Sequence, residues 1–381
     1  MTASILTARN ATLTDLHALL EAQHAAKLDV VVPARDLTVA GGNVIVTGAG
    51  DPVLTPDGVS PGRVSLRPTS HADANLAAKL DIPIKYLRRL RERHIELYDH
   101  SVNTLLGEDP DYRFLVRALV DGATDHGVGR AFLSSSYRVT DNLDVLVTVL
   151  AGIRDAGVAV EITRCDLSET RMYVIVSCPA IAAYAPSLLA NYTSPFSGAR
   201  GADNPLVHAG FVISNSETGH GRTSITPRLT VEICDNGAVI TQDALAATHL
   251  GAKMTDGVIR WGADTRAAEL SLIAKQTRDA VTTFLDIDYV HAKLAEIERD
   301  AGVIITNPTA TLEHVGQQLR FNADQRQTIL SHFIDGGDRS SGGVLHAVTS
   351  AAQLLTDPDA AHEMERSGLR AMTLAAAHAS R

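Results

Sequence analysis

The chain has 381 residues and a formal net charge of −10, so any contact with nucleic acid or an anionic membrane needs a local cationic patch. Hydrophobic residues form 45% of the sequence and aromatic residues only 4%, which indicates a folded protein with few flat rings for base stacking. The three cysteines are isolated, the N-terminus does not resemble a leader, and no apolar run reaches 18 residues. We therefore expect a cytoplasmic protein that does not span a membrane.

The first region, residues 1–62, predicts one helix and a small antiparallel β meander. Residues 14–27 place leucine and alanine near a helical stripe, with Thr14 as the N-cap. Prolines and glycines then separate three β-branched runs, and residues 56–62 read as a turn-rich surface loop. The three runs cover residues 28–33, 36–41 and 43–48.

The second region, residues 63–260, alternates helices with strands. Helical spacing across residues 70–94, interrupted at Pro83, predicts two helices joined by a tight turn. Asp141 is positioned to cap a helix that Gly157 closes. The predicted strands cover residues 114–121 and 129–139, a hairpin at 159–179, and the runs Val207–Ile213 and Ser224–Cys234, which we expect to pair.

The third region, residues 261–381, reads as helix throughout. Residues 265–302 are nearly continuous in helical pattern, and further helices are predicted at 311–319, 323–334, 342–355 and 358–379. The fold class predicted from the whole chain is α+β, with antiparallel sheets and packed helices followed by a helical C-terminal region.

Three separated passages resemble one family in the same order. They are GRAFLSSSYRVTDNLDVL at residues 129–146, NSETGHGRTSITPRLTVEICDNGAVI at 215–240 and SSGGVLHAVTSAAQ at 340–353. The family is the phage- and plasmid-borne domain of unknown function 932, and the resemblance spans roughly residues 65–355. It implies a mobile-element origin near genes of DNA replication, recombination or defence. It supplies no catalytic residue set.

Titratable residues crowd around glycine-rich turns between His208 and Lys253, which marks a candidate site because unpaired buried polar groups tend to be functional. The members of this candidate polar cluster are Asn215, Glu217, His220, Arg222, Cys234, Asp235, Asn236 and His249.

Three chemical interpretations of that cluster stay open beside a structural one. A metal site would use His208, His220, Glu232 and His249, although they lack ligand spacing. A Cys234 nucleophile would need a histidine base, Asp235 and the Asn236 amide. Backbone amides of residues 215–222 would cradle a phosphate. A buried cysteine, a tight turn and a hairpin loop explain the same residues, so we assign no metal, cofactor or catalytic residue.

A basic run on the second predicted helix is the clearest indication of a partner. Five cations, Lys85, Arg88, Arg89, Arg91 and Arg93, fall within nine residues of an acidic chain, and helical geometry lets them neutralise phosphates in a row. Further along, Arg130, Tyr137 and Arg138 lie in a predicted strand, where the ring would stack on a base. A solvated or intersubunit face paired with nearby carboxylates is the alternative for the run.

These patterns favour a nucleic-acid-binding protein of phage or plasmid DNA metabolism. Single-stranded DNA is the favoured ligand, annealing is suggested only by analogy with the family's gene neighbours, and the C-terminal helices are expected to make homo-oligomer contacts. Two alternatives remain open: a metal- or cysteine-dependent hydrolase using residues 208–249, and an interaction protein that inhibits a host defence enzyme through an acidic, DNA-like surface.

Overall fold

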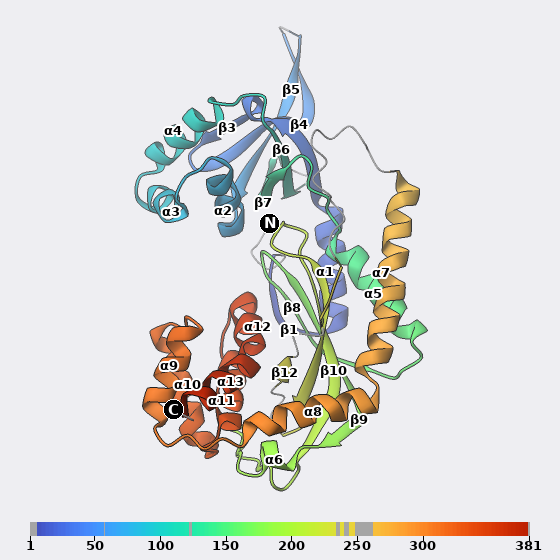
Figure 1. The fold of residues 1–381 in the computed structure, drawn as a ribbon. Coiled ribbons are helices and arrows are strands. Elements are labelled where there is room, and N and C mark those ends of the chain that lie inside the picture. Colours follow the sequence, from blue (N-terminus) through green and yellow to red (C-terminus); the bar gives the residue numbers. More distant parts are fainter. Residues whose placement is uncertain are drawn as a thin grey trace.

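The computed structural model describes residues 6–56, 58–121, 124–233, 237–239, 244–247 and 262–379. Two β-sheets with packed helices are followed by a helical C-terminal region (Figure 1), which confirms the predicted α+β class. Among the described helices, none is both long and apolar enough to cross a membrane.

The helices are α1 (Leu13–Ala25), α2 (Ser70–Lys79), α3 (Ile84–Arg93), α4 (Ile95–Leu106), α5 (Asn142–Asp155), α6 (Pro186–Leu189), α7 (Ala263–Phe284), α8 (Ile287–Ala301), α9 (Pro308–Gln318), α10 (Ala323–Gly336), α11 (Ser341–Gln353), α12 (Pro358–Arg366) and α13 (Gly368–Ala379). The strands are β1 (Ala8–Ala11), β2 (Lys27–Pro33), β3 (Leu37–Ala40), β4 (Asn43–Thr55), β5 (Gly58–Pro68), β6 (Arg113–Val120), β7 (His126–Ser134), β8 (Glu161–Leu167), β9 (Met172–Tyr184), β10 (Leu206–Asn215), β11 (Thr223–Val231), β12 (Gly237–Val239) and β13 (Leu245–Ala247).

The smaller sheet has the strand order β2-β6-β7-β5-β4-β3, and only its β5–β7 pair is parallel. Helices α2, α3 and α4 cover one face of this sheet (Figure 1). Buried side chains alternate along β3 and along the second half of β5, as expected for strands with one covered face, whereas the central strands β6 and β7 are buried continuously. This core includes Val46, Leu66, Val116 and Phe132 from the strands and Leu76, Leu87, Leu90 and Val102 from the helices.

The larger sheet has the order β1-β8-β9-β10-β11-β12, and β13 also pairs with β11. We call the larger sheet with its helices the larger-sheet half of the molecule, and the smaller sheet with its helices the smaller-sheet half. Strand β1 and helix α1 belong to the larger-sheet half, so the chain leaves this half at Lys27, forms the smaller sheet, and returns at α5. Helices α1, α5, α7 and α8 pack on one apolar face. Gly152 permits the close approach of α5 to α7, because a Cβ there would lie 2.5 Å from the Ala274 carbonyl oxygen.

The other face of the larger sheet is polar and is covered by α12. Asp166 on β8 accepts hydrogen bonds from the His362 ring at 2.8 Å and from Arg9 at 2.5 Å. Glu365 accepts two from Arg228 of β11, at 2.6 and 2.9 Å. The His362 ring also stacks on Tyr173, with centroids 3.8 Å apart. Ion pairs, rather than apolar packing, therefore join this helix to the sheet.

The C-terminal region is helical in every described residue from Ala263 onward except at the connections, as predicted. It has a core of its own, in which α11 is buried along nearly its whole length. Two predicted helices are each divided in two. The first divides at Asp286, which caps α8 through the Asp288 and Tyr289 backbone amides. The second divides at Ser367, which is the C-cap of α12 and precedes the start of α13 at Gly368.

Several sequence predictions for residues 6–68 need correction. Thr12, rather than Thr14, caps α1, because it forms a capping box with Asp15. The predicted meander is incomplete, since β2 pairs with β6 instead of β3. Most of the loop expected at residues 56–62 is strand. The boundary predicted between the first two regions, after residue 62, falls inside β5. Prolines are tolerated there because the tip is a two-stranded ribbon whose outer edges face solvent.

Helix α4 was not predicted from the sequence, and the strand predicted at residues 129–139 ends earlier than expected. Helix α4 packs beside α3 and buries Tyr98 and Val102 in the smaller core. Strand β7 ends at Ser134, so Tyr137 and Arg138 lie in the segment that leads to α5 rather than in the sheet. The predicted pairing of β10 with β11 is confirmed along its length.

Candidate functional site

The basic run predicted from the sequence lies on α3, which begins after Pro83 and buries Leu87 and Leu90 against the smaller sheet. The opposite side of this helix is exposed to solvent and carries four of the five predicted cations. Within the described part of the chain, none of these four side chains forms an ion pair or a side-chain hydrogen bond. The four residues, named here the α3 cationic face, are Lys85, Arg88, Arg89 and Arg93.

The fifth cation, Arg91, is a structural residue. Its guanidinium lies 2.5 Å from the Asp73 carboxylate, donates to the Gly42 carbonyl at 2.8 Å and contacts the Tyr98 hydroxyl. The same group stands over the Tyr98 ring, 4.2 Å from its centroid. Arg91 thus holds α2, α4 and the β3–β4 turn together, and its charge is already paired.

A network of buried ion pairs joins the two halves of the molecule where the chain passes between them. Arg117 on β6, with a side chain only 1% exposed, donates to Asp29 at 2.8 and 3.0 Å and to Asp141 at 2.6 Å. Lys27 reaches the other Asp141 oxygen at 2.6 Å. We call this network, together with the Arg130–Glu217 pair described next, the junction.

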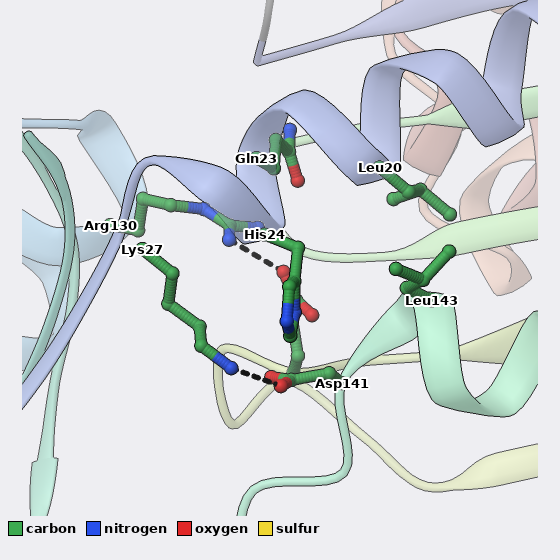
Figure 2. Close-up of a pocket in the computed structure, with 8 residues that line it drawn as sticks. Leu20, Gln23, His24, Lys27, Arg130, Asp141 and Leu143 are labelled. Carbon is green, nitrogen blue, oxygen red and sulfur yellow. Dashed lines mark hydrogen bonds and ion pairs between the residues drawn. The ribbon is translucent and has the colours of Figure 1, made fainter. Parts of the chain in front are cut away.

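Arg130 and Glu217 complete the junction in a narrow pocket beside α1 (Figure 2). The two side chains pair at 2.5 Å. The second Glu217 oxygen accepts a hydrogen bond from the backbone amide of Asn142 at the start of α5. Glu217 therefore satisfies the helix end that Asp141 was predicted to cap, while Asp141 turns toward Lys27 and Arg117. Arg130, predicted to contact nucleic acid, is 6% exposed and paired within the protein.

Charge pairing dominates the electrostatics of the junction. Burial by itself raises the pKa of Asp141, but Arg117 and Lys27 lower it more, so the pKa lies below its ordinary value. Burial lowers the pKa of Arg117, yet hydrogen bonds to Asp29 and the charge of Glu217 raise it further, and the net direction is upward. Both shifts favour the ionised forms of Asp141 and Arg117, so neither group is poised as a general acid or base.

The β10–β11 loop, which the sequence marks as the polar cluster, docks on the smaller-sheet half. The His71 ring donates to the Thr218 carbonyl at 2.8 Å and meets His220 edge to face, with centroids 5.6 Å apart. Arg171 donates to the His220 carbonyl at 2.6 Å. Because several loop carbonyls point into these contacts, the loop serves as a docking element rather than a phosphate cradle.

Other cluster residues support the junction or lie elsewhere. Asn215 is fully buried and donates to Asn142 at 2.8 Å and to the Thr140 carbonyl at 3.1 Å. Arg222 is exposed. Tyr137 is partly buried, and its hydroxyl lies 3.5 Å from the Ser216 carbonyl. Burial raises the pKa of that hydroxyl. Cys234, Asp235, Asn236 and His249 lie outside the described residues.

The described members of the metal constellation considered for this region, His208, His220 and Glu232, do not come together. His208 pairs with Glu232 at the start of β10, whereas His220 lies in the loop beyond the other end of that strand. The strand from His208 to its last residue, Asn215, is about 23 Å long at 3.3 Å per residue. In the described part of the chain, no group of three His, Cys, Asp or Glu side chains is placed to hold a metal ion. Of the two described cysteines, Cys165 is buried, which raises its pKa to about 12 and leaves the thiol unreactive.

Three members of the junction were not predicted from the sequence: Lys27, Asp29 and Arg117. A usable signal was present, since Arg117 interrupts the otherwise apolar run FLVRALV. Arginine in a buried strand needs a buried partner. The identity of that partner depends on the tertiary fold, because Asp29, Asp141 and Glu217 are up to 100 residues distant in sequence.

Comparison with known proteins adds no relative. No protein-family model matches the chain, and neither a curated protein nor a solved structure is significantly similar to it. The functional interpretation therefore rests on the chain's own residues, and the resemblance to the phage and plasmid family remains a prediction.

Proposed function

We propose that this chain binds nucleic acid, with single-stranded DNA as its favoured ligand, through the α3 cationic face. The observation that carries the proposal is the contrast between this dense exposed face and the arginines that are paired inside the protein. Four cations stand in solvent on α3 without a described acidic partner, whereas Arg91, Arg117, Arg130 and Arg228 are paired inside the protein.

The spacing of these cations suits a phosphate backbone. Lys85 and Arg89 are one helical turn apart, and Arg89 and Arg93 are separated by the next turn. Residues four apart lie on the same side of a helix, about 6 Å from each other. That separation is comparable to the distance between successive phosphates in an extended strand, so each cation meets its own phosphate and releases its counterions.

Tyr86 supports the preference for unpaired strands. Its ring is 53% exposed, and it lies on the helix surface between Arg89 and Leu90, beside the cations rather than in the core. A base that is not paired stacks on such a ring, whereas a base inside a duplex is already stacked on its neighbours. The ring adds affinity for single strands beyond the charge term.

The distribution of charge also favours approach from this side. Residues 27–134 contain 13 Lys and Arg and 14 Asp and Glu, so they carry only −1 of the total −10. The remaining residues carry −9 and repel a polyanion. An approaching DNA strand is therefore directed toward the smaller-sheet half of the molecule.

The proposal is tested by replacing Lys85, Arg88 and Arg89 with alanine and measuring DNA affinity at several salt concentrations. The slope of log K against log salt for single-stranded DNA should fall by about 2, because each lost phosphate contact removes about 0.7. The variant should bind more weakly and remain folded. The matched control removes three exposed cations from the C-terminal half and should leave the slope unchanged: Arg278, Arg299 and Arg370 to alanine.

Two results would overturn the proposal. If the wild-type chain binds neither single- nor double-stranded DNA at low salt, where electrostatic attraction is strongest, nucleic-acid binding fails and the interaction-protein alternative takes its place. If the control variant loses as much affinity as the α3 variant, the attraction is diffuse and the α3 cationic face is not the site.

We also propose a setting for this activity. The family resemblance favours phage or plasmid DNA metabolism, and the described cysteines, Cys165 and Cys178, are free thiols in keeping with the cytoplasm. Homo-oligomer contacts through the C-terminal helices are also proposed, since Ile334 and Leu354 are 65% and 56% exposed there. Light scattering of the purified chain tests the last point.

A further inference from the structure

A polar recess of about 390 Å³ lies where the larger-sheet half meets the C-terminal helices. Three connecting segments form it: the loop after α6, the linker after α8 and the turn between α10 and α11. Its volume falls within the range of about 300–1,000 Å³ that is usual for small-molecule sites. The recess is lined by Ala190, Asn191, Tyr192, Thr193, Arg200, Ile304, Gly337, Asp338 and Arg339.

Two arginines give this recess its charge. Arg200 and Arg339 are exposed, and neither side chain forms an ion pair or hydrogen bond with another described residue. The carboxylate among the lining residues belongs to Asp338, which is only 3% exposed and accepts a hydrogen bond from the Ser340 amide at 3.0 Å. That carboxylate is turned into its own loop, so the surface of the recess presents positive charge.

The walls of the recess are fixed by backbone contacts. The Thr193 amide donates to the Gly336 carbonyl at 2.9 Å, and Ile305 donates to the Arg339 carbonyl at 2.8 Å. Gly337 adopts a left-handed conformation at φ +73°, which turns the chain sharply after α10. Beneath the wall, Tyr192 stacks on the buried His346 ring with centroids 4.1 Å apart. A ligand here meets a site whose backbone is already ordered, which reduces the entropic cost of binding.

We propose that this recess binds a small phosphate-bearing polyanion, such as pyrophosphate or the phosphates of a nucleotide. Guanidinium groups recognise phosphate through paired, charge-assisted hydrogen bonds, and the Asn191 amide and Thr193 hydroxyl are available along the same wall. The buried position of Tyr192 leaves no aromatic platform for a base, so the phosphates, rather than the base, provide the recognition. This inference is independent of the α3 cationic face.

The test is calorimetric titration of the full chain with inorganic pyrophosphate. Wild type should bind, and Arg200→Ala with Arg339→Ala should weaken binding by at least about tenfold, because the double variant loses both guanidinium groups that would donate charged hydrogen bonds to the phosphates. The variant carrying alanine at Lys85, Arg88 and Arg89 is the matched control and should bind pyrophosphate as wild type does. Melting of the double variant without ligand should match wild type, because both side chains are exposed.

Two further arms identify the source of the phosphate. A 5′-phosphorylated oligonucleotide that binds more tightly than its unphosphorylated form, with the gain lost in the double variant, would assign the recess to a strand end. An equal affinity of both oligonucleotides, beside tight pyrophosphate binding, would assign it to a free small molecule. The proposal is overturned if wild type does not bind pyrophosphate, if the double variant binds it equally well, or if citrate binds with the same affinity.

Discussion

The junction and the α3 cationic face are both dense in charge, yet they differ in what surrounds those charges. At the junction, Arg117 and Arg130 are 1% and 6–7% exposed, and their carboxylate partners lie within 3 Å. On α3, four cations of similar chemistry are exposed and lack a described partner. Charge density in the sequence is therefore a poor guide to a binding surface, whereas burial and pairing distinguish a structural cluster from an available one.

The physical reason for this difference lies in desolvation. An ion that leaves water loses several kcal/mol of hydration and must recover it from partners inside the protein. The junction therefore contains equal numbers of positive and negative side chains. The cations Lys27, Arg117 and Arg130 pair with the carboxylates of Asp29, Asp141 and Glu217. Residues of the α3 cationic face keep their hydration, so no partner is required until a ligand arrives.

The largest expected effect is at the junction. Replacing Arg117 with alanine should reduce the free energy of unfolding by about 3–5 kcal/mol, because Asp29 and Asp141 lose their buried partner. Urea unfolding at pH 7 measures it. Arg113→Ala on the same strand is the matched control and should stay within about 0.5 kcal/mol, since that side chain is exposed. Equal midpoints for the two variants would contradict the structural role given to the junction.

A second prediction separates the paired cation of α3 from the exposed cations of the same helix. Arg91→Ala should cost about 1.5–3 kcal/mol, the usual worth of hydrogen bonds to a charged group, because Asp73 and the Gly42 carbonyl lose their donor. Arg88→Ala, three residues earlier, should change stability by less than about 0.5 kcal/mol. Thermal melts of both variants provide the measurement. A loss of stability in Arg88→Ala as large as that in Arg91→Ala would show that the exposed face is also structural.

This distinction within one helix shows how far sequence reasoning extends. Helical spacing correctly predicted α3 and its basic run, because periodicity is a local property. It did not separate Arg91 from Arg88, since the partner of Arg91 is supplied by α2 and by a turn 49 residues away. The pairing of β10 with β11 was likewise predicted from local alternation and a short connection.

Non-local pairing accounts for the remaining differences. Strand β2 resembles a member of the meander that follows it, but it pairs with β6, whose Val116 lies opposite Val30. Glu217 was expected to belong to a candidate functional cluster, yet it caps α5 from 75 residues away. Neither contact leaves a trace in residue spacing, because each joins segments that lie far apart in the sequence. The recess around Arg200 and Arg339 was overlooked for the same reason, since three distant segments form it.

The dependence of stability on pH gives a third, smaller effect at the docked loop. Burial lowers the pKa of His71, and its bond to the Thr218 carbonyl offsets only part of this. The unfolded chain then binds more protons than the folded one below about pH 6.5, so stability should fall as pH drops from that value through the folded pKa. His71→Gln keeps the donor and removes the titration. Its unfolding free energy should therefore decline less than that of wild type between pH 7 and 5, and parallel curves would contradict the prediction.

The smallest predicted effect has the opposite sign and concerns Lys85. This cation lies in the first turn of α3, where the helix dipole disfavours positive charge, and it is one turn from Arg89. Both interactions are repulsive, so Lys85→Gln should stabilise the chain by about 0.3–0.5 kcal/mol at low salt and by less at high salt. Paired urea curves at two salt concentrations measure this, with Lys79→Gln in the last turn of α2 as the control of expected opposite sign. A stabilising change at Lys85 that also weakens DNA binding would mean that the α3 cationic face is held at a cost in stability for the sake of its ligand, as is common at functional sites. A destabilising change would instead place Lys85 with the paired, structural charges of the junction.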